Sequence, residues 1–171
     1  MARIIVTGAT GFIGKALCFR LIEEKYDVVA LSRSKEKGEK IFGTDAIVVE
    51  WDGKSAEVLQ KYINGAYAVV NLAGENIGSG RWTPKRKQSI LQSRLDAGKA
   101  IVVAVKSAEK KPRVIIQASA IGYYGSRGDE IIDESSSPGD GFLVEVVKKW
   151  EQSTREVETH KVRRVIIRSS I

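Results

Sequence analysis

The sequence is poor in the residues that build disulfide frameworks and metal sites. Its 171 residues include one cysteine, Cys18, and one histidine, His160. A single cysteine excludes an internal disulfide framework and fits a reducing compartment, so we expect a cytoplasmic protein. No spacing of Cys, His and acidic residues matches a metal motif, so no metal is predicted. We expect Cys18 to be a small core hydrophobe and His160 to be an exposed structural residue.

Long apolar runs are also missing. No stretch of about 18 apolar residues occurs, and glycines interrupt the N-terminal MARIIVTGAT before a signal peptide's apolar core would form. We therefore expect neither a membrane partner nor a signal peptide. With 43% hydrophobic and 29% charged residues, the composition is that of a globular protein, and residues 1–171 are expected to form one domain.

The net charge is +7, with basic clusters at residues 81–87, 110–113 and 161–164. Such clusters attract phosphates, so a nucleic-acid surface is one interpretation. Solvated helix ends and loops are the interpretation that we favour, because no nucleic-acid motif accompanies the charge.

Strand-like and helix-like segments alternate along the chain, which predicts parallel strands joined by crossover helices. The expected strands are residues 3–7, 28–31, 46–50, 66–71, 114–117 and 165–167. The expected helices run from the first glycine-rich loop to about residue 25, over 34–40, over 55–62, from 83 to before 112, and over 142–150. A loop is expected over 118–141. The predicted fold is a doubly wound α/β sheet of the Rossmann type, with about six strands, helices on both faces, and runs such as VVAL, AIVV and VII buried on both sides.

A glycine-rich turn links the first strand to the first helix. Its glycines stand at Gly8, Gly11 and Gly14. In such a turn the first glycine permits the tight bend, the second lets a pyrophosphate approach the backbone, and the third lets the helix pack closely on the strand. Because the helix N-terminus attracts phosphates, this context favours a dinucleotide site over a turn without a ligand.

The end of the second strand lacks the acidic residue by which NAD-binding proteins hold the ribose 2′-hydroxyl. The chain reads Leu31-Ser32-Arg33-Ser34-Lys35 there. Arg33, assisted by Ser32, is suited to a 2′-phosphate, so NADP(H) is favoured over NAD(H). The alternative is that Arg33 is a solvated loop charge.

Separated motifs occur in an order that resembles the short-chain dehydrogenase/reductase superfamily. They are TGATGFIG at 7–14, NLAGENI at 71–77, RWT at 81–83, SR at 93–94, SAIGYYG at 119–125 and KKWE at 148–151. The set is similar to an atypical, extended, epimerase-like branch with labels such as "NAD-dependent epimerase" or "cell-division-inhibitor-like". Since extended members continue into a substrate domain, the resemblance implies that only the N-terminal domain is present.

This resemblance implies roles for individual residues. Arg33 would meet the 2′-phosphate, and Asp52 would lie near the adenine. The ribose and nicotinamide half would run beside Leu72, Ala73 and Gly74. The loop around the diphosphate would comprise Gly8, Thr10, Gly11, Phe12, Ile13 and Gly14. Ser119 lies near the catalytic Ser/Thr position, although alignment on the Tyr-Gly pair places Ala120 there.

In the superfamily, a Tyr and a Lys four residues later on one helix carry out the proton transfer. This sequence departs from that pattern, because Phe142 and Val146 stand at the two positions. Neither side chain can transfer a proton. The remaining acid–base candidates are Tyr123, Tyr124 and Glu75, with packing of the loop as the alternative for the tyrosines. Arg81, Trp82, Lys85 and Arg94 are candidates for an anionic substrate or for surface packing.

The expected function is therefore NADP(H) binding within an epimerase-like oxidoreductase that acts on a nucleotide sugar or a similar carbonyl or hydroxyl substrate. The alternative is a non-catalytic NADPH-binding or sensing module, so whether the chain is an enzyme stays open. The sequence does not fix the oligomeric state, and a homodimer through the long helices is one hypothesis for it.

Overall fold

One sheet of six parallel strands forms the centre of the molecule, and the structure, a computed structural model, describes residues 1–170. The strands are β1 (Arg3–Thr7), β2 (Asp27–Ser32), β3 (Ile47–Glu50), β4 (Ala68–Asn71), β5 (Val114–Ala120) and β6 (Arg163–Ser169). Their order across the sheet is β3-β2-β1-β4-β5-β6. The order reverses between β1 and β4, and ligands of doubly wound sheets bind at such a point, beyond the carboxyl ends of the strands.

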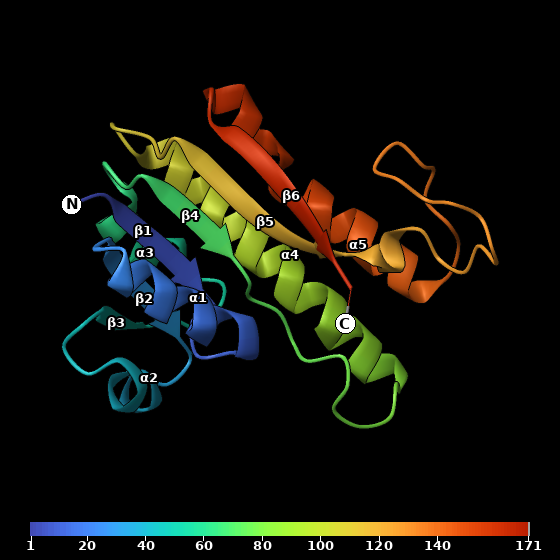
Figure 1. The fold of residues 1–171 in the computed structure, drawn as a ribbon, viewed down its shortest axis with the longest axis horizontal. Helices are drawn as coiled ribbons and strands as arrows, with labels where there is room; N and C mark the ends of the chain where they lie inside the picture. Colours follow the sequence, from blue (N-terminus) through green and yellow to red (C-terminus); the bar gives the residue numbers. More distant parts are fainter. Residues whose placement is uncertain (171) are drawn as a thin grey trace.

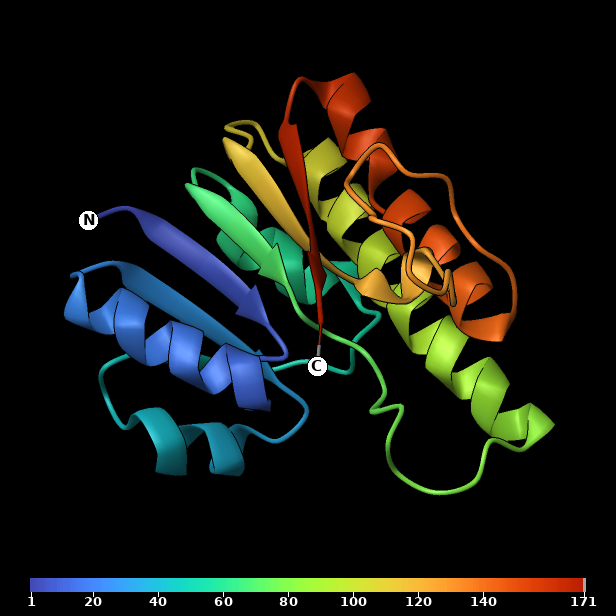
Figure 2. The ribbon, with the colours of Figure 1, turned by 45° about the vertical axis from the view of Figure 1, so that its right-hand side comes forward.

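Helices cover both faces of this sheet (Figures 1 and 2). The helices α1 (Phe12–Glu23) and α2 (Lys35–Phe42) pack on one face, where Cys18 and Phe42 join the core. The other face is covered by α3 (Ala56–Ile63), α4 (Pro84–Ser107) and α5 (Phe142–Gln152), together with the 3-10 segment η2 (Arg155–His160). A second 3-10 segment, η1 (Ile121–Tyr123), follows β5. The predicted doubly wound fold is confirmed.

Several element bounds differ from the sequence prediction. The fifth strand continues to Ala120, so residues 118–120 belong to a strand and not to the expected loop, and the sixth spans Arg163–Ser169. Ala118–Ala120 pair with Ile167–Ser169 and so extend the β5–β6 pairing. The sequence did not indicate this extension, because residues 118–120 are small or polar and do not read as a strand. The first helix begins at Phe12 and ends at Glu23, two residues before the expected end.

The strands at the two edges are also more exposed than expected. β2 and β4 are buried on both faces, apart from the partly exposed Asp27. In contrast, Ile47 of β3 and Ile167 of β6 are exposed, because each lies on an edge strand without a second neighbour. Continuous burial of AIVV and VII was therefore a wrong prediction.

The isolated cysteine and histidine have different environments. Cys18 is fully buried, as expected, and desolvation raises the pKa of its thiol to about 12. His160, predicted to be exposed, is partly buried at the end of η2 because that segment packs against the core through Val157.

A buried polar ladder joins the ends of β1 and β4 to the middle of β5. The Thr7 hydroxyl donates to Asn71 Oδ1 at 2.7 Å, and Asn71 Nδ2 donates to Gln117 Oε1 at 2.8 Å. The same hydroxyl oxygen accepts the backbone N–H groups of Leu72 and Ala73. All three ladder side chains are fully buried, so the chain leaving β4 is fixed against the end of β1.

Over residues 1–170, no helix is both long enough and apolar enough to cross a membrane. Within the same range, no group of three or more His, Cys, Asp and Glu side chains is placed to hold a metal ion.

Replacing Gln117 by leucine is expected to destabilise the fold by about 1–3 kcal/mol, because the buried Asn71 amide then loses its acceptor. Urea unfolding of Gln117→Leu measures the effect. Gln88→Leu on the exposed face of α4 is the matched control and is expected to change the free energy of unfolding by less than about 0.5 kcal/mol. Equal stabilities for the two variants would contradict the role of the ladder.

Candidate functional site

The turn after β1 has the close contacts that its three glycines predict. Gly8 has φ +67°, and a Cβ there would lie 2.9 Å from the Leu72 carbonyl oxygen. At Gly14 a Cβ would overlap the Gly8 carbonyl oxygen and lie 2.9 Å from Ala9 Cα. Gly8 therefore allows close packing against the loop that follows β4 (residues 72–83, here the β4 loop), and Gly14 allows α1 to pack against the backbone of Gly8 and Ala9.

Gly11 differs because it lies on the exposed side of the turn, where a Cβ would have a single close neighbour, the Gly8 carbonyl oxygen at 3.1 Å. It is the N-cap residue of α1, and its own N–H donates to the Gly8 carbonyl at 3.0 Å. The next three N–H groups, of Phe12, Ile13 and Gly14, have no acceptor within the helix. No acidic residue lies in this first turn, and the Phe12 side chain is 97% exposed. The helix end thus offers N–H donors and a positive dipole to an anion.

The end of β2 is tied to this turn by two hydroxyl groups. Thr10 Oγ1 and Ser32 Oγ lie 3.0 Å apart, and Ser32 Oγ also accepts the Ser34 N–H. Ser32 is buried, whereas the next residue, Arg33, has a side chain that is 82% exposed. Arg33 Nη1 lies 3.7 Å from Glu75 Oε2. The structure thus brings the 2′-phosphate candidate and an acid–base candidate together.

Asp52, the candidate for the adenine, follows β3 but holds its own turn. It accepts the backbone N–H groups of Lys54 and Ser55 and the Ser55 hydroxyl. Its slight desolvation acts to raise the pKa of the carboxyl, but these hydrogen bonds outweigh it and lower the pKa. The side chain therefore stays ionised and is already well supplied with donors.

The β4 loop, with the candidates Leu72, Ala73 and Gly74, is held from α4. Arg94 Nη1 donates to the Glu75 carbonyl at 3.1 Å and to the Ile90 carbonyl at 2.9 Å. A Cβ at Gly74 would lie 3.0 Å from Arg94 Cζ, so the guanidinium is packed directly beneath the loop. Burial lowers the pKa of Arg94, and Glu75 opposes that shift.

The Glu75 side chain is engaged by cations. Arg86 Nη1 donates to Glu75 Oε1 at 2.9 Å, and the same guanidinium contacts the Asn76 carbonyl and the Ser79 hydroxyl. The Glu75 N–H donates to Ser93 Oγ at 3.0 Å. In this arrangement Glu75 anchors the loop and neutralises charge, and its carboxylate is not a free base.

The remaining acid–base candidates gather around an arginine that sequence reasoning missed. Ser119 Oγ donates to Glu151 Oε1 at 2.6 Å, and Glu151 accepts Arg168 Nε at 2.7 Å and Nη2 at 3.0 Å. Arg168 Nη1 donates to the Tyr124 hydroxyl at 2.8 Å, and its Cζ lies 3.7 Å from the Tyr123 ring centroid. The hydrogen bond to Glu151 raises the Arg168 pKa, burial lowers it, and the bond to Tyr124 raises it further, so the pKa is raised overall.

This cluster buries Ser119, which is 3% exposed, and Tyr124. Ser119 faces α5 through Glu151, whereas Ala120 lies on the opposite side of β5. Glu151 stands in the KKWE motif, which was the one sequence signal for it. Arg168 carried no signal, because its partners come from β5, η1 and α5.

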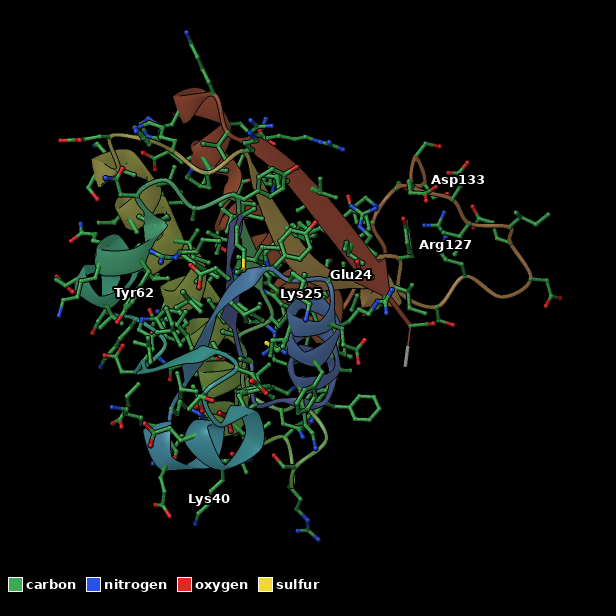
Figure 3. The ribbon with its side chains drawn as sticks, turned by 60° about the vertical axis from the view of Figure 1, so that its left-hand side comes forward. Glu24, Lys25, Lys40, Tyr62, Arg127 and Asp133 are labelled. Atoms are coloured by element: carbon green, nitrogen blue, oxygen red, sulfur yellow. The ribbon has the colours of Figure 1, made fainter. Side chains whose placement is uncertain are left out.

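The helix that should hold the Tyr-x-x-x-Lys pair presents apolar side chains. Phe142 is the first residue of α5, 5.7 Å from the Trp82 ring and 5.1 Å from Lys87 Nζ. Val146 is buried. Lys148 is exposed and pairs with Glu145 at 3.1 Å. The long loop that precedes α5 carries Arg127 and Asp133, and it projects from the body of the molecule (Figure 3).

Comparison with known proteins gives one family. Residues 4–141 match the model of the NAD dependent epimerase/dehydratase family. The chain is 39% identical over 153 residues to an epimerase family protein SDR39U1 homolog, chloroplastic, of Arabidopsis thaliana, covering 86% of this chain and 43% of that protein. It is 33% identical to the epimerase family protein YfhF of Bacillus subtilis, covering 98% and 54%. The chain thus spans about half the length of the curated relatives it matches.

Solved structures agree with this assignment. A human epimerase family protein SDR39U1 (isoform 2), solved with NADPH, superposes with a TM-score of 0.79 at 29% identity, over 99% of this chain and 54% of that one. A UDP-galactose 4-epimerase superposes with a TM-score of 0.80 at 21% identity, over 97% and 55%, and shows the shared fold alone.

Replacing Glu151 by glutamine is expected to destabilise the fold by about 1–3 kcal/mol, because Arg168 loses a bidentate charge-assisted partner. Urea unfolding of Glu151→Gln tests this against Glu145→Gln, which removes an exposed pair on the same helix and is expected to cost less than about 0.5 kcal/mol. A Glu151→Gln protein as stable as the control would show that the cluster does not hold β6 to α5.

Proposed function

The chain belongs to the NAD dependent epimerase/dehydratase family, and we propose that it is the NADP(H)-binding part of an epimerase-like oxidoreductase acting on a nucleotide sugar or a similar carbonyl or hydroxyl substrate. The observation that carries the proposal is the turn between β1 and α1. Gly8 and Gly14 are required there by packing, while Gly11 leaves the helix end open to a ligand.

The residues present fit a dinucleotide phosphate. The N–H groups of Phe12, Ile13 and Gly14 would bind the pyrophosphate, since they have no acceptor within the helix. Arg33 would bind the 2′-phosphate, because its exposed guanidinium can form parallel charge-assisted bonds. The NADPH in the human relative's structure supports this choice of cofactor. The bases and riboses would run past Asp52 and the Leu72–Gly74 segment.

The nicotinamide, when bound, supplies the hydride chemistry. This chain must supply the proton transfer, and Phe142 and Val146 have no group for it. Ser119 donates its proton to Glu151, and the Glu75 carboxylate is paired with Arg86, whereas the Tyr124 hydroxyl accepts from Arg168 and so keeps its own proton. We therefore place the acid–base role with Tyr123 or Tyr124, which lie beyond the carboxyl end of β5 with Arg168 beside both.

A non-catalytic NADPH-binding or sensing module is the second candidate function. The apolar pair at Phe142 and Val146 favours it, because cofactor binding needs neither residue to ionise. Turnover of a carbonyl substrate that is lost in Tyr123→Phe or Tyr124→Phe would favour the enzyme. NADPH binding without turnover by the whole protein would favour the module.

Substitution of Gly11 by valine is expected to weaken NADPH and NADH binding alike by more than about tenfold, because its side chain would occupy the pyrophosphate position. Isothermal titration calorimetry measures both affinities, with thermal unfolding as a check on folding. Gly78→Val is the matched control, since Gly78 is an exposed loop glycine with an ordinary φ. Unchanged affinity in Gly11→Val would contradict the phosphate-loop assignment.

Truncation of Arg33 to alanine is expected to weaken NADPH binding by about tenfold to hundredfold, since charge-assisted bonds to the 2′-phosphate are lost. NADH affinity should fall by less than about threefold. Arg20→Ala, which removes an exposed arginine of α1 paired with its own helix, is the control. Equal losses for the two cofactors in Arg33→Ala would refute the 2′-phosphate assignment.

A further inference from the structure

The Arg33–Glu75 ion pair crosses the end of β1. Arg33 follows β2 directly, and Glu75 lies four residues beyond β4. These strands are the two neighbours of β1, one on each side. An ion pair that joins their ends therefore passes over the carboxyl end of β1, where Gly8 begins the turn into α1.

The two partners are held very differently. Glu75 is held in place, because Arg86 donates to its carboxylate, Ser93 accepts its N–H and Arg94 donates to its carbonyl. The Arg33 side chain is held weakly: it is 82% exposed, and the 3.7 Å between its Nη1 and Glu75 Oε2 is too long for a hydrogen bond. If Arg33 moves away, Glu75 still pairs with Arg86, so breaking the Arg33–Glu75 pair does not leave the carboxylate without a cationic partner.

The Arg33 side chain lies across the path that a dinucleotide cofactor would take. In a doubly wound sheet the pyrophosphate binds at the N-terminus of the first helix and the adenosine ribose at the end of the second strand. Here these points are the Gly11 end of α1 and the Ser32 end of β2. Arg33 lies at the second point but extends its side chain past β1 to the β4 loop.

Building on the function proposed above, we propose that the Arg33–Glu75 ion pair is a latch over the cofactor path and that Arg33 leaves Glu75 when a dinucleotide binds. A ligand with a 2′-phosphate gives the released guanidinium a new dianionic partner. A ligand with a 2′-hydroxyl must also open the latch, but it offers Arg33 no ionic partner in exchange.

A double-mutant cycle with NADH as the probe tests the latch, because NADH has no phosphate for Arg33. Calorimetry at low ionic strength compares wild type, Glu75→Gln, Arg33→Ala and the double variant. Glutamine still accepts the Arg86 hydrogen bond, so the β4 loop keeps its anchor. With Arg33 present, Glu75→Gln should tighten NADH binding about two- to fivefold, the range expected for an exposed ion pair.

With Arg33 already replaced by alanine, the same change should alter NADH affinity by less than about 1.5-fold, because no latch remains to open. In the Arg33-containing protein, Glu75→Gln should also tighten NADPH binding by about two- to fivefold. Glu130→Gln, which breaks the exposed Arg127–Glu130 pair on the long loop, serves as the matched control and should change neither affinity.

An equal effect of Glu75→Gln in both backgrounds would show a simple charge effect and overturn the latch. No tightening when Arg33 is present would overturn it as well, provided that thermal unfolding shows the variant to be folded. If wild type binds neither NADPH nor NADH, the proposed function itself fails. NADPH binding in wild type without coupling between Arg33 and Glu75 removes the latch alone.

Discussion

The hydrogen bond between Thr7 and Asn71 is the constraint on which the site depends. It joins the ends of β1 and β4, where the strand order reverses, and Gln117 extends it to β5. Because the Thr7 hydroxyl oxygen also accepts the Leu72 and Ala73 N–H groups, the β4 loop leaves the sheet in a fixed direction. The absence of a side chain at Gly8 then lets this loop lie directly against the glycine-rich turn after β1. Three buried polar side chains thus fix the backbone beneath the proposed cofactor site.

Charged side chains hold the β4 loop beyond the point where the Thr7–Asn71–Gln117 ladder fixes it. Arg86 and Arg94 reach from α4 to the β4 loop, and Arg94 does so although burial opposes its charge. The buried charge of Arg94 is compensated in part: Nη1 donates to two carbonyl groups and Cζ lies 4.8 Å from the Trp150 ring centroid, while Nε has no hydrogen-bond partner among the described residues. On the other side of β5, Arg168 and Glu151 tie β6 to α5 in the same manner. The β4 loop is therefore held to α4 by one ion pair and by a hydrogen bond to its backbone, and β6 is held to α5 by another ion pair.

The parts of the site that sequence predicts are the local ones. The turn from Gly8 to Gly14 could be predicted because the strand, the glycines and the helix are consecutive, and the missing acidic residue after β2 is likewise a local fact. The Arg33–Glu75 contact could not, since it requires the order β2-β1-β4 across the sheet. The partners of Ser119 also depend on long-range pairing, which places Ser119 beside Arg168. Edge exposure of β3 and β6 follows from strand order in the same way.

The two halves of the chemistry place unequal demands on the sequence. Cofactor binding as proposed relies on backbone N–H groups, close packing and one exposed arginine, so it tolerates wide variation in side chains. Proton transfer needs a titratable group at a fixed place, and α5 has Phe142 and Val146 where the superfamily's pair would stand. The polar groups that remain nearby are bound to one another: Ser119 to Glu151, and Tyr124 to Arg168. Because Ser119 gives its proton to Glu151 whereas Tyr124 accepts from Arg168, Tyr124 is the member of this cluster that keeps a proton to transfer, in line with the role proposed for it.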